Sequence, residues 1–227
     1  MISLQTHDSQ TYAVASSGVI PTFIHFNGNK SRHRERMSNY LEKLHTDQFK
    51  LPPYIGVFSL CTKNINLNNQ LLYKHTQKYG NFVNWLGTDT LIKRYNNVHK
   101  FKNWHKALKE TNYEYYLFLD SDILVNHAFE LDMLTKEHVI IGAEKNFWYN
   151  SYINKQKIKE YYNDTYINSG LVLGHRKVLE EVMDELAKHQ DSFRCDQALW
   201  LHEVACQDLP VKLDEDNKLM YCLFKQG

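Results

Sequence analysis

Several features that mark common protein classes are absent from this sequence. A membrane-spanning helix needs about 18 or more consecutive apolar residues, and no stretch of the chain approaches that length. Residues 1–18 are polar and lack the apolar core of a signal peptide. We therefore expect a cytoplasmic protein without a membrane partner. The 27 lysines and arginines nearly balance the 26 aspartates and glutamates, which argues against a dominant nucleic-acid-binding field.

Closely spaced cysteines and glycine-rich loops are also missing. The four cysteines lie far apart and form no C-x-x-C pair, which excludes the short zinc signatures and suits reduced thiols in a cytosol. They are Cys61, Cys195, Cys206 and Cys222. A glycine-rich phosphate loop, which most nucleotidyltransferases would show, is not present. No repeat, low-complexity tract or convincing linker interrupts the chain, so we expect a single domain.

The most informative feature that is present is an apolar run ending in two acids. Residues 115–119 are all apolar or aromatic and lead directly into Asp120-Ser121-Asp122. Such a run predicts a strand buried on both faces, as in a parallel sheet covered by helices. Ligands of these sheets bind beyond the carboxyl ends of the strands, where two carboxylates can hold Mg²⁺ or Mn²⁺ against a diphosphate. The alternative is an ordinary turn-forming aspartate.

Strand and helix signals alternate from residue 54 onward. Their β-α-β-α-β order predicts an α/β domain with a mostly parallel sheet flanked by helices. Residues 1–53 either complete this domain or form an appendage. We expect strands at 54–60, 82–87, 115–119, 138–143, 167–174, 211–213 and 219–224, and helices at 66–79, 98–109, 129–136, 177–188 and 196–204.

His25 is a further candidate, at the end of a short apolar strand near the N-terminus. A histidine in such a place is usually structural, but imidazole is also an acceptable Mn²⁺ ligand beside two carboxylates. The turn that follows, Asn27-Gly28-Asn29, can present backbone N–H groups to an anion. The basic residues between 30 and 36 form either a solvated helix face or a phosphate-binding segment.

Three other polar sites each have two interpretations. Asp196 is either a helix N-cap or a carboxylate that faces an acceptor hydroxyl. The segment Asn168-Ser169-Gly170 is either a bulge or the lining of a sugar pocket. Lys100 and Lys102 begin a helix, where they either lie exposed or reach a phosphate.

The order of these segments resembles that of GT-A glycosyltransferases, and in particular the glycosyltransferase domain of the procollagen lysyl hydroxylase family. The likeness covers most of residues 54–224 and rests on Trp85-Leu86-Gly87, 100–104, 119–122, 141–144, 167–170 and Asp196-Gln197. It implies a GT-A (Rossmann-like) fold and a metal-dependent transferase. It also implies transfer of a hexose, with glucose as the first expectation, from a UDP-sugar with retention at the anomeric carbon.

One motif of that family is displaced here. Its His-x-Asn-Gly motif, which supplies a metal ligand, follows the closing strands, whereas the likeness in this chain, 25–28, precedes the first strand of the core. We therefore expect a circular permutation, in which residues 1–53 correspond to the family's C-terminal end and residues 54–227 form the nucleotide-sugar and acceptor core. Chains tolerate permutation when the old termini lie close together. His25 should then fold back beside Asp120 and Asp122.

The resemblance gives each candidate residue a role. The metal ligands would be His25, Asp120 and Asp122 around Mn²⁺ or Mg²⁺, although the family's acidic motif is more widely spaced and does not decide which aspartate contacts the ion. The expected nucleotide-sugar contacts are Trp85, Lys100, Lys102, Ser121, Ser169, Gly170, Asn27 and Gly28. The residues expected around the transferred sugar and the acceptor, as the catalytic set, are Glu144, Asn168 and Asp196.

The acceptor is expected to be a hydroxyl group on a macromolecule. The resemblance implies a hydroxylysine-type protein, whereas a viral or bacterial cytosol suits a hydroxymethylated DNA base contacted by residues 30–36. Two other functions stay open: a nucleotidyltransferase-like nucleotide-sugar enzyme, and a catalytically silent module that binds a nucleotide sugar. No oligomeric state is predicted.

Overall fold

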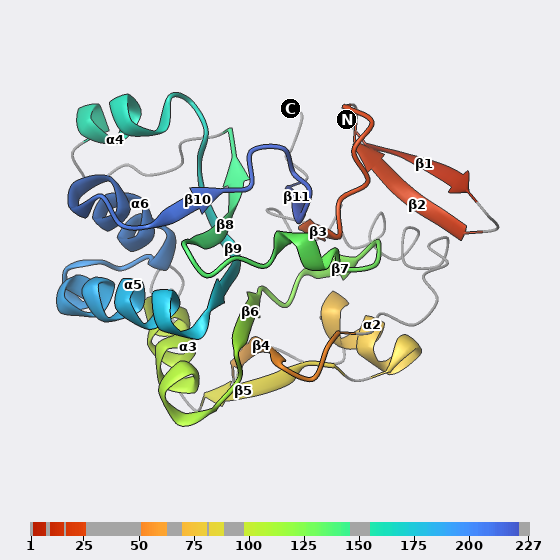
Figure 1. Ribbon diagram of the computed structural model, residues 1–227, viewed down its shortest axis with the longest axis horizontal. Helices are drawn as coiled ribbons and strands as arrows, with labels where there is room; N and C mark the ends of the chain where they lie inside the picture. Colours follow the sequence, from red (N-terminus) through yellow and green to blue (C-terminus); the bar gives the residue numbers. More distant parts are fainter. Residues whose placement is uncertain are drawn as a thin grey trace.

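The computed structural model describes residues 2–7, 10–15, 17–25, 51–62, 70–80, 82–88, 98–145 and 155–222. Within these ranges the fold is α/β, with a six-stranded, mostly parallel sheet at its centre (Figure 1). The strands in spatial order are β10 (Val211–Leu213), β8 (Val139–Glu144), β9 (Tyr166–His175), β6 (Tyr115–Leu119), β4 (Ile55–Thr62) and β5 (Asn84–Thr88). In this sheet β9 runs antiparallel to both of its neighbours, and the other pairs are parallel.

Helices cover one face of the main sheet. The side chains of β6 alternate between the two faces, as in any strand, and Tyr116 and Phe118 point into the helical layer. Trp104 stacks on Phe118 with ring centroids 5.0 Å apart. The helical layer consists of α3 (Val98–Glu110), α4 (Lys155–Tyr162), α5 (Arg176–His189) and α6 (Asp196–Gln207) (Figure 1). None of the described helices is both long and apolar enough to cross a membrane.

A helix and a small sheet cover the opposite face of the main sheet. Leu117 and Leu119 of β6 lie on this face and pack against them. The helix is α2 (Leu71–Tyr79), and the small sheet has the order β11 (Met220–Cys222), β3 (Phe23–His25), β7 (Ile123–Val125). Next to it lies a hairpin of β1 (Ile2–His7) and β2 (Gln10–Ala15) (Figure 1). The buried Asn126 side chain holds this hairpin through hydrogen bonds to the N–H and C=O of Ala13, at 2.7 and 2.9 Å.

Most of the predicted elements are confirmed, with differences at their ends. The predicted helix 66–79 is wrong at Gln70, which is extended, so that α2 begins at Leu71. The Gln70 side chain instead accepts a hydrogen bond from Ser121 Oγ at 2.8 Å. The predicted helix 129–136 is only a 3-10 turn, Leu131–Met133. The sequence prediction missed α4, β7 and the β1–β2 hairpin, because tertiary packing stabilises short elements whose local signal is weak.

Candidate metal centre

The candidate site lies at the edge of the main sheet where its parallel strands end. The strand register places Trp85 of β5 and Leu119 of β6 level with the same residue of β4, Ser59. Asp120 therefore emerges at the carboxyl edge, where Glu144 also ends β8. Because β9 is antiparallel, it enters the sheet at this edge with its Asn168-Ser169-Gly170 segment. The fold thus brings together segments that the sequence separates widely.

A bulge in β9 shapes this edge. Ile141 pairs with Val172, but the next residue of β8, Gly142, pairs with Asn168. One step on β8 therefore matches four on β9, and three extra residues, 169–171, are accommodated. The Asn168 side chain closes the bulge, since its Oδ1 accepts from the Gly170 N–H at 2.9 Å. Of the two interpretations of this segment, the bulge agrees with the strand register, and the sugar-pocket interpretation stays a prediction.

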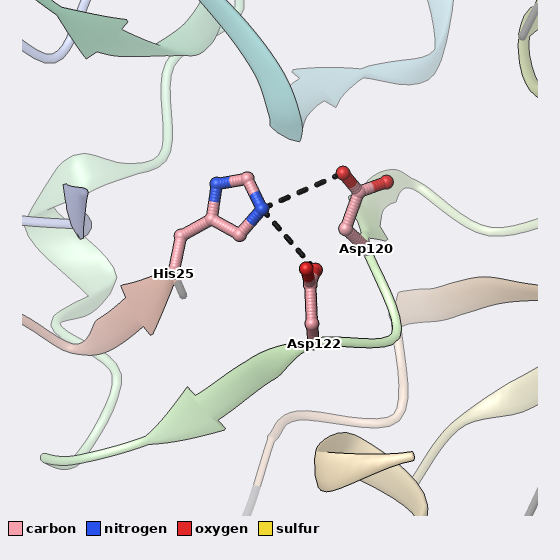
Figure 2. Close-up of side chains that lie close together, drawn as sticks. All are labelled: His25, Asp120 and Asp122. Atoms are coloured by element: carbon pink, nitrogen blue, oxygen red, sulfur yellow. Dashed lines mark ion pairs between the residues drawn. The ribbon is translucent and has the colours of Figure 1, made fainter. Parts of the chain in front are cut away.

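Strand pairing in the small sheet delivers His25 to the two acids. β3 and β7 pair antiparallel with His25 opposite Ile123, the residue directly after Asp122. The imidazole Nε2 lies 3.2 Å from Asp122 Oδ1 and 3.6 Å from Asp120 Oδ2. Figure 2 shows the ring pointing at both carboxylates from a separate strand. The prediction that His25 folds back beside these aspartates is confirmed.

These three residues, the metal triad, can hold a divalent cation. Each offers one ligand atom, and the three atoms lie within 4.8 Å of one another. Two carboxylates with one imidazole suit a relatively hard transition-metal ion such as Mn²⁺. The imidazole fits here because Gly170 has no side chain: a Cβ on that residue would lie 2.5 Å from His25 Cε1.

The ion pair within the metal triad shifts the pKa values of its members. Burial lowers the pKa of His25, but the charge and hydrogen bond of Asp122 outweigh it, so this pKa lies well above its ordinary value. Burial in turn raises the pKa of Asp122, yet the charged imidazole holds it below the ordinary value. A cation bound at these atoms would take the place of the imidazolium proton.

Lys100 forms a second centre of charge beside the metal triad. Its Nζ lies 2.9 Å from Asp120 Oδ1 and 2.9 Å from Asp196 Oδ2, and it donates to the Ser169 carbonyl at 3.1 Å. Burial lowers the pKa of Lys100, but the two aspartates raise it well above its usual range. Burial and the charges of Asp122 and Asp196 raise the pKa of Asp120, although Lys100 and His25 act to lower it. Because Lys100 occupies Oδ1, the other oxygen of Asp120 faces His25.

The predicted catalytic residues are buried and hydrogen-bonded to protein groups. Asp196 is the first residue of α6, with Cys195 in the N-cap position, so the N-cap interpretation is wrong. Its Oδ2 accepts from Ser169 Oγ at 2.7 Å as well as from Lys100. Glu144 accepts from Asn168 Nδ2 at 3.0 Å and from Gln197 Nε2. Asn168, Glu144 and Asp196 therefore brace the bulge and the start of α6.

Other predicted contacts lie apart from this network. Lys102, two residues along α3 from Lys100, points to another side of the helix and forms an ion pair with the exposed Asp191 at 2.7 Å. This pairing gives no support to a phosphate contact by Lys102. The half-buried Trp85 packs edge-on against Tyr73, with ring centroids 5.8 Å apart. Asn27, Gly28 and residues 30–36 lie outside the described residues, so the predictions made for them stay predictions.

Two residues at the site were not among the sequence candidates. Gln197 binds Glu144, and Cys222 lies against the outer edge of the His25 ring. Gln197 could have been chosen for its position next to Asp196, but nothing local marks Cys222, which is 197 positions from His25.

Neither a scan of protein-family models nor a search of curated proteins finds a match to this chain.

Proposed function

We propose that this chain is a metal-dependent GT-A glycosyltransferase that transfers a hexose, with glucose the first candidate, from a UDP-sugar to a hydroxyl group of a macromolecule. The observation that carries the proposal is the metal triad at the carboxyl edge of the sheet. The resemblance to a permuted glycosyltransferase domain predicts His25 as a third ligand, and its ring lies within 4 Å of both acids. A chance histidine on a distant strand would not be expected there.

The arrangement of the small sheet supports the permutation. β3 lies between β7 and the C-terminal strand β11, and it pairs in parallel with β11, Cys222 being aligned with His25. If residues 1–53 followed the present C-terminal end in an ancestral chain, only the β1–β2 hairpin would stand between β11 and β3 in the order of described strands. The permutation would then keep the same strand pairing and change only the place where the chain begins and ends.

The described residues can perform three tasks in this reaction. His25, Asp120 and Asp122 would hold Mn²⁺ or Mg²⁺, which when bound supplies positive charge to a leaving diphosphate. Lys100 fixes the orientation of the Asp120 carboxylate and compensates the negative charge of Asp196 through an ion pair. Ser169, whose hydroxyl donates to Asp196, and Gly170, whose N–H donates to Asn168, hold the shape of the bulge beside which the transferred sugar would lie.

Two other functions make different predictions about the same site. A silent binding module would bind a nucleotide sugar without turnover, and a nucleotidyltransferase would release pyrophosphate instead of UDP.

The braced, buried state of Asp196 agrees with a positioning role better than with that of a free general base. This agrees with a retaining transferase, for which no deprotonated base facing the acceptor is required.

The test is UDP release from UDP-glucose and other UDP-sugars with and without Mn²⁺. We expect Mn²⁺-dependent release, and we expect His25→Ala and Asp122→Ala each to lower it by about 100-fold or more, since a metal contributes several kcal/mol to charge stabilisation. Asp184→Asn, which alters a carboxylate beside a surface histidine, is the matched control and should keep the wild-type rate. Wild-type turnover by both triad variants would refute the metal assignment.

Two further measurements separate the transferase from a silent module and identify the acceptor: thermal stabilisation by a UDP-sugar, and UDP release with added acceptors. A UDP-sugar at 100 times its dissociation constant should stabilise the protein by about 2.7 kcal/mol, and stabilisation without UDP release would identify a silent module. Duplex DNA with hydroxymethylated bases and a hydroxylysine peptide are then added in parallel. The true acceptor raises UDP release, and with DNA the effect should fall steeply as salt increases.

A further inference from the structure

The imidazole of His25 has a second polar neighbour on the side away from the acids. Its Nδ1 lies 3.8 Å from Cys222 Sγ, while Nε2 faces Asp120 and Asp122. The contact follows from strand pairing, because β11 and β3 run in parallel with Cys222 aligned to His25. Both side chains are 4% exposed, so the ring nitrogen meets the thiol with little access for water.

The ring is held on a further side by the bulge of β9. The Gly170 backbone lies so close that an added Cβ would be 2.8 Å from His25 Nδ1. The Gly170 N–H is itself engaged by Asn168, so this backbone does not donate to the ring. Among the described residues, the Cys222 sulfur lies within hydrogen-bonding distance of Nδ1.

We propose that Cys222 is a positioning residue that fixes the orientation and tautomer of His25 for metal binding; this inference rests on the metal site of the proposed function. A metal-binding histidine donates its other ring N–H to an acceptor, and that acceptor sets the tautomer. With Nε2 on the ion, the ring proton sits on Nδ1 and is donated to Cys222 Sγ. A thiol is a weak, neutral acceptor, so it orients the ring without adding a third negative charge to the two aspartates.

The test is calorimetric titration of Mn²⁺ alone into the full chain and its variants. Loss of a histidine's outer partner typically weakens metal binding by 10–100-fold, and for a weak thiol acceptor we expect about 10-fold in Cys222→Ala. Cys222→Ser keeps an acceptor at the same position and should stay within about threefold of wild type. Met220→Leu alters a buried residue of the same strand, near Gly142, and should bind Mn²⁺ like wild type.

Each outcome either supports or overturns the inference. A wild-type chain that binds no Mn²⁺ overturns the metal site and the inference together. If the wild type binds Mn²⁺ and Cys222→Ala binds it equally well, only the role of Cys222 is lost. Equal weakening in Cys222→Ala and Cys222→Ser, or in Met220→Leu, would assign the effect to packing. Melting temperatures taken in parallel ensure that every titration is made on folded protein.

Discussion

Two clusters in this molecule combine the same three residue types in different surroundings. The site cluster holds Asp120 between His25 and Lys100 at the carboxyl edge of the main sheet. The surface cluster holds Asp184 of α5 between His105 and Lys109 of α3, at 2.7 and 2.8 Å. In the site cluster the carboxylate side chain is 26% exposed, against 51% in the surface cluster.

The surroundings reverse the direction of the pKa shift of the carboxylate. Burial, together with the charges of Asp122 and Asp196, raises the pKa of Asp120 above its ordinary value despite two cationic neighbours. At Asp184 burial also raises the pKa, but the hydrogen bonds and charges of Lys109 and His105 together outweigh it, so the pKa is lowered. The surface cluster is a solvated ion pair between two helices. The site cluster keeps several charges in a confined space, which costs stability and is typical of sites that bind ligands.

The largest effect should come from removing the lysine of each cluster. Lys100→Met leaves Asp120 and Asp196 without their shared cation, and we expect a loss of about 3 kcal/mol or more in the free energy of unfolding. Lys109→Met breaks an exposed pair and should cost about 1 kcal/mol at most. Denaturant unfolding of both variants measures the difference. Similar losses would mean that the two clusters are energetically alike.

A smaller effect is expected from a methyl group placed against the site cluster. In Gly170→Ala the new Cβ would lie 2.5 Å from His25 Cε1 and 2.8 Å from Asn168 Oδ1. Such overpacking should cost about 2 kcal/mol of stability and weaken Mn²⁺ binding by moving the imidazole. Gly87→Ala is the control, since no atom of the described residues beyond its chain neighbours lies within 4 Å of its Cβ position. The measurements are denaturant unfolding and Mn²⁺ titration of both variants. If Gly170→Ala and Gly87→Ala behave alike, His25 is not packed closely against Gly170.

The smallest effect concerns the acid of the surface cluster and its dependence on pH. Because the pKa of Asp184 is lowered by folding, its stabilisation is present above the ordinary carboxyl pKa and is lost as the pH falls through the folded value. Asp184→Asn should therefore cost a few tenths of a kcal/mol at pH 7, as for exposed pairs, and progressively less as the pH falls below the ordinary carboxyl pKa. Unfolding curves across this range test the sign. A difference that grows as the pH falls would refute it.

Local sequence predicted the framework of this fold and part of its site. The apolar run 115–119 and the acids after it were recognisable because a strand buried on both faces has a continuous apolar signature. The periodic pattern of α5, whose buried residues include Val178, Val182 and Leu186, was equally clear. Short elements such as β7, with three residues, carry no such signature, and their strand pairing depends on β3.

The chain alone determined which acids stand at a strand end and, through a resemblance in motif order, that His25 should join them. Only the tertiary structure decided how the charges are shared: Lys100 takes one oxygen of Asp120, His25 faces the other, and Cys222 lies behind the imidazole. The physical reason is that hydrogen bonds and ion pairs depend on distances of a few ångströms between distant segments. Sequence spacing fixes such distances only within a single helix, strand or turn.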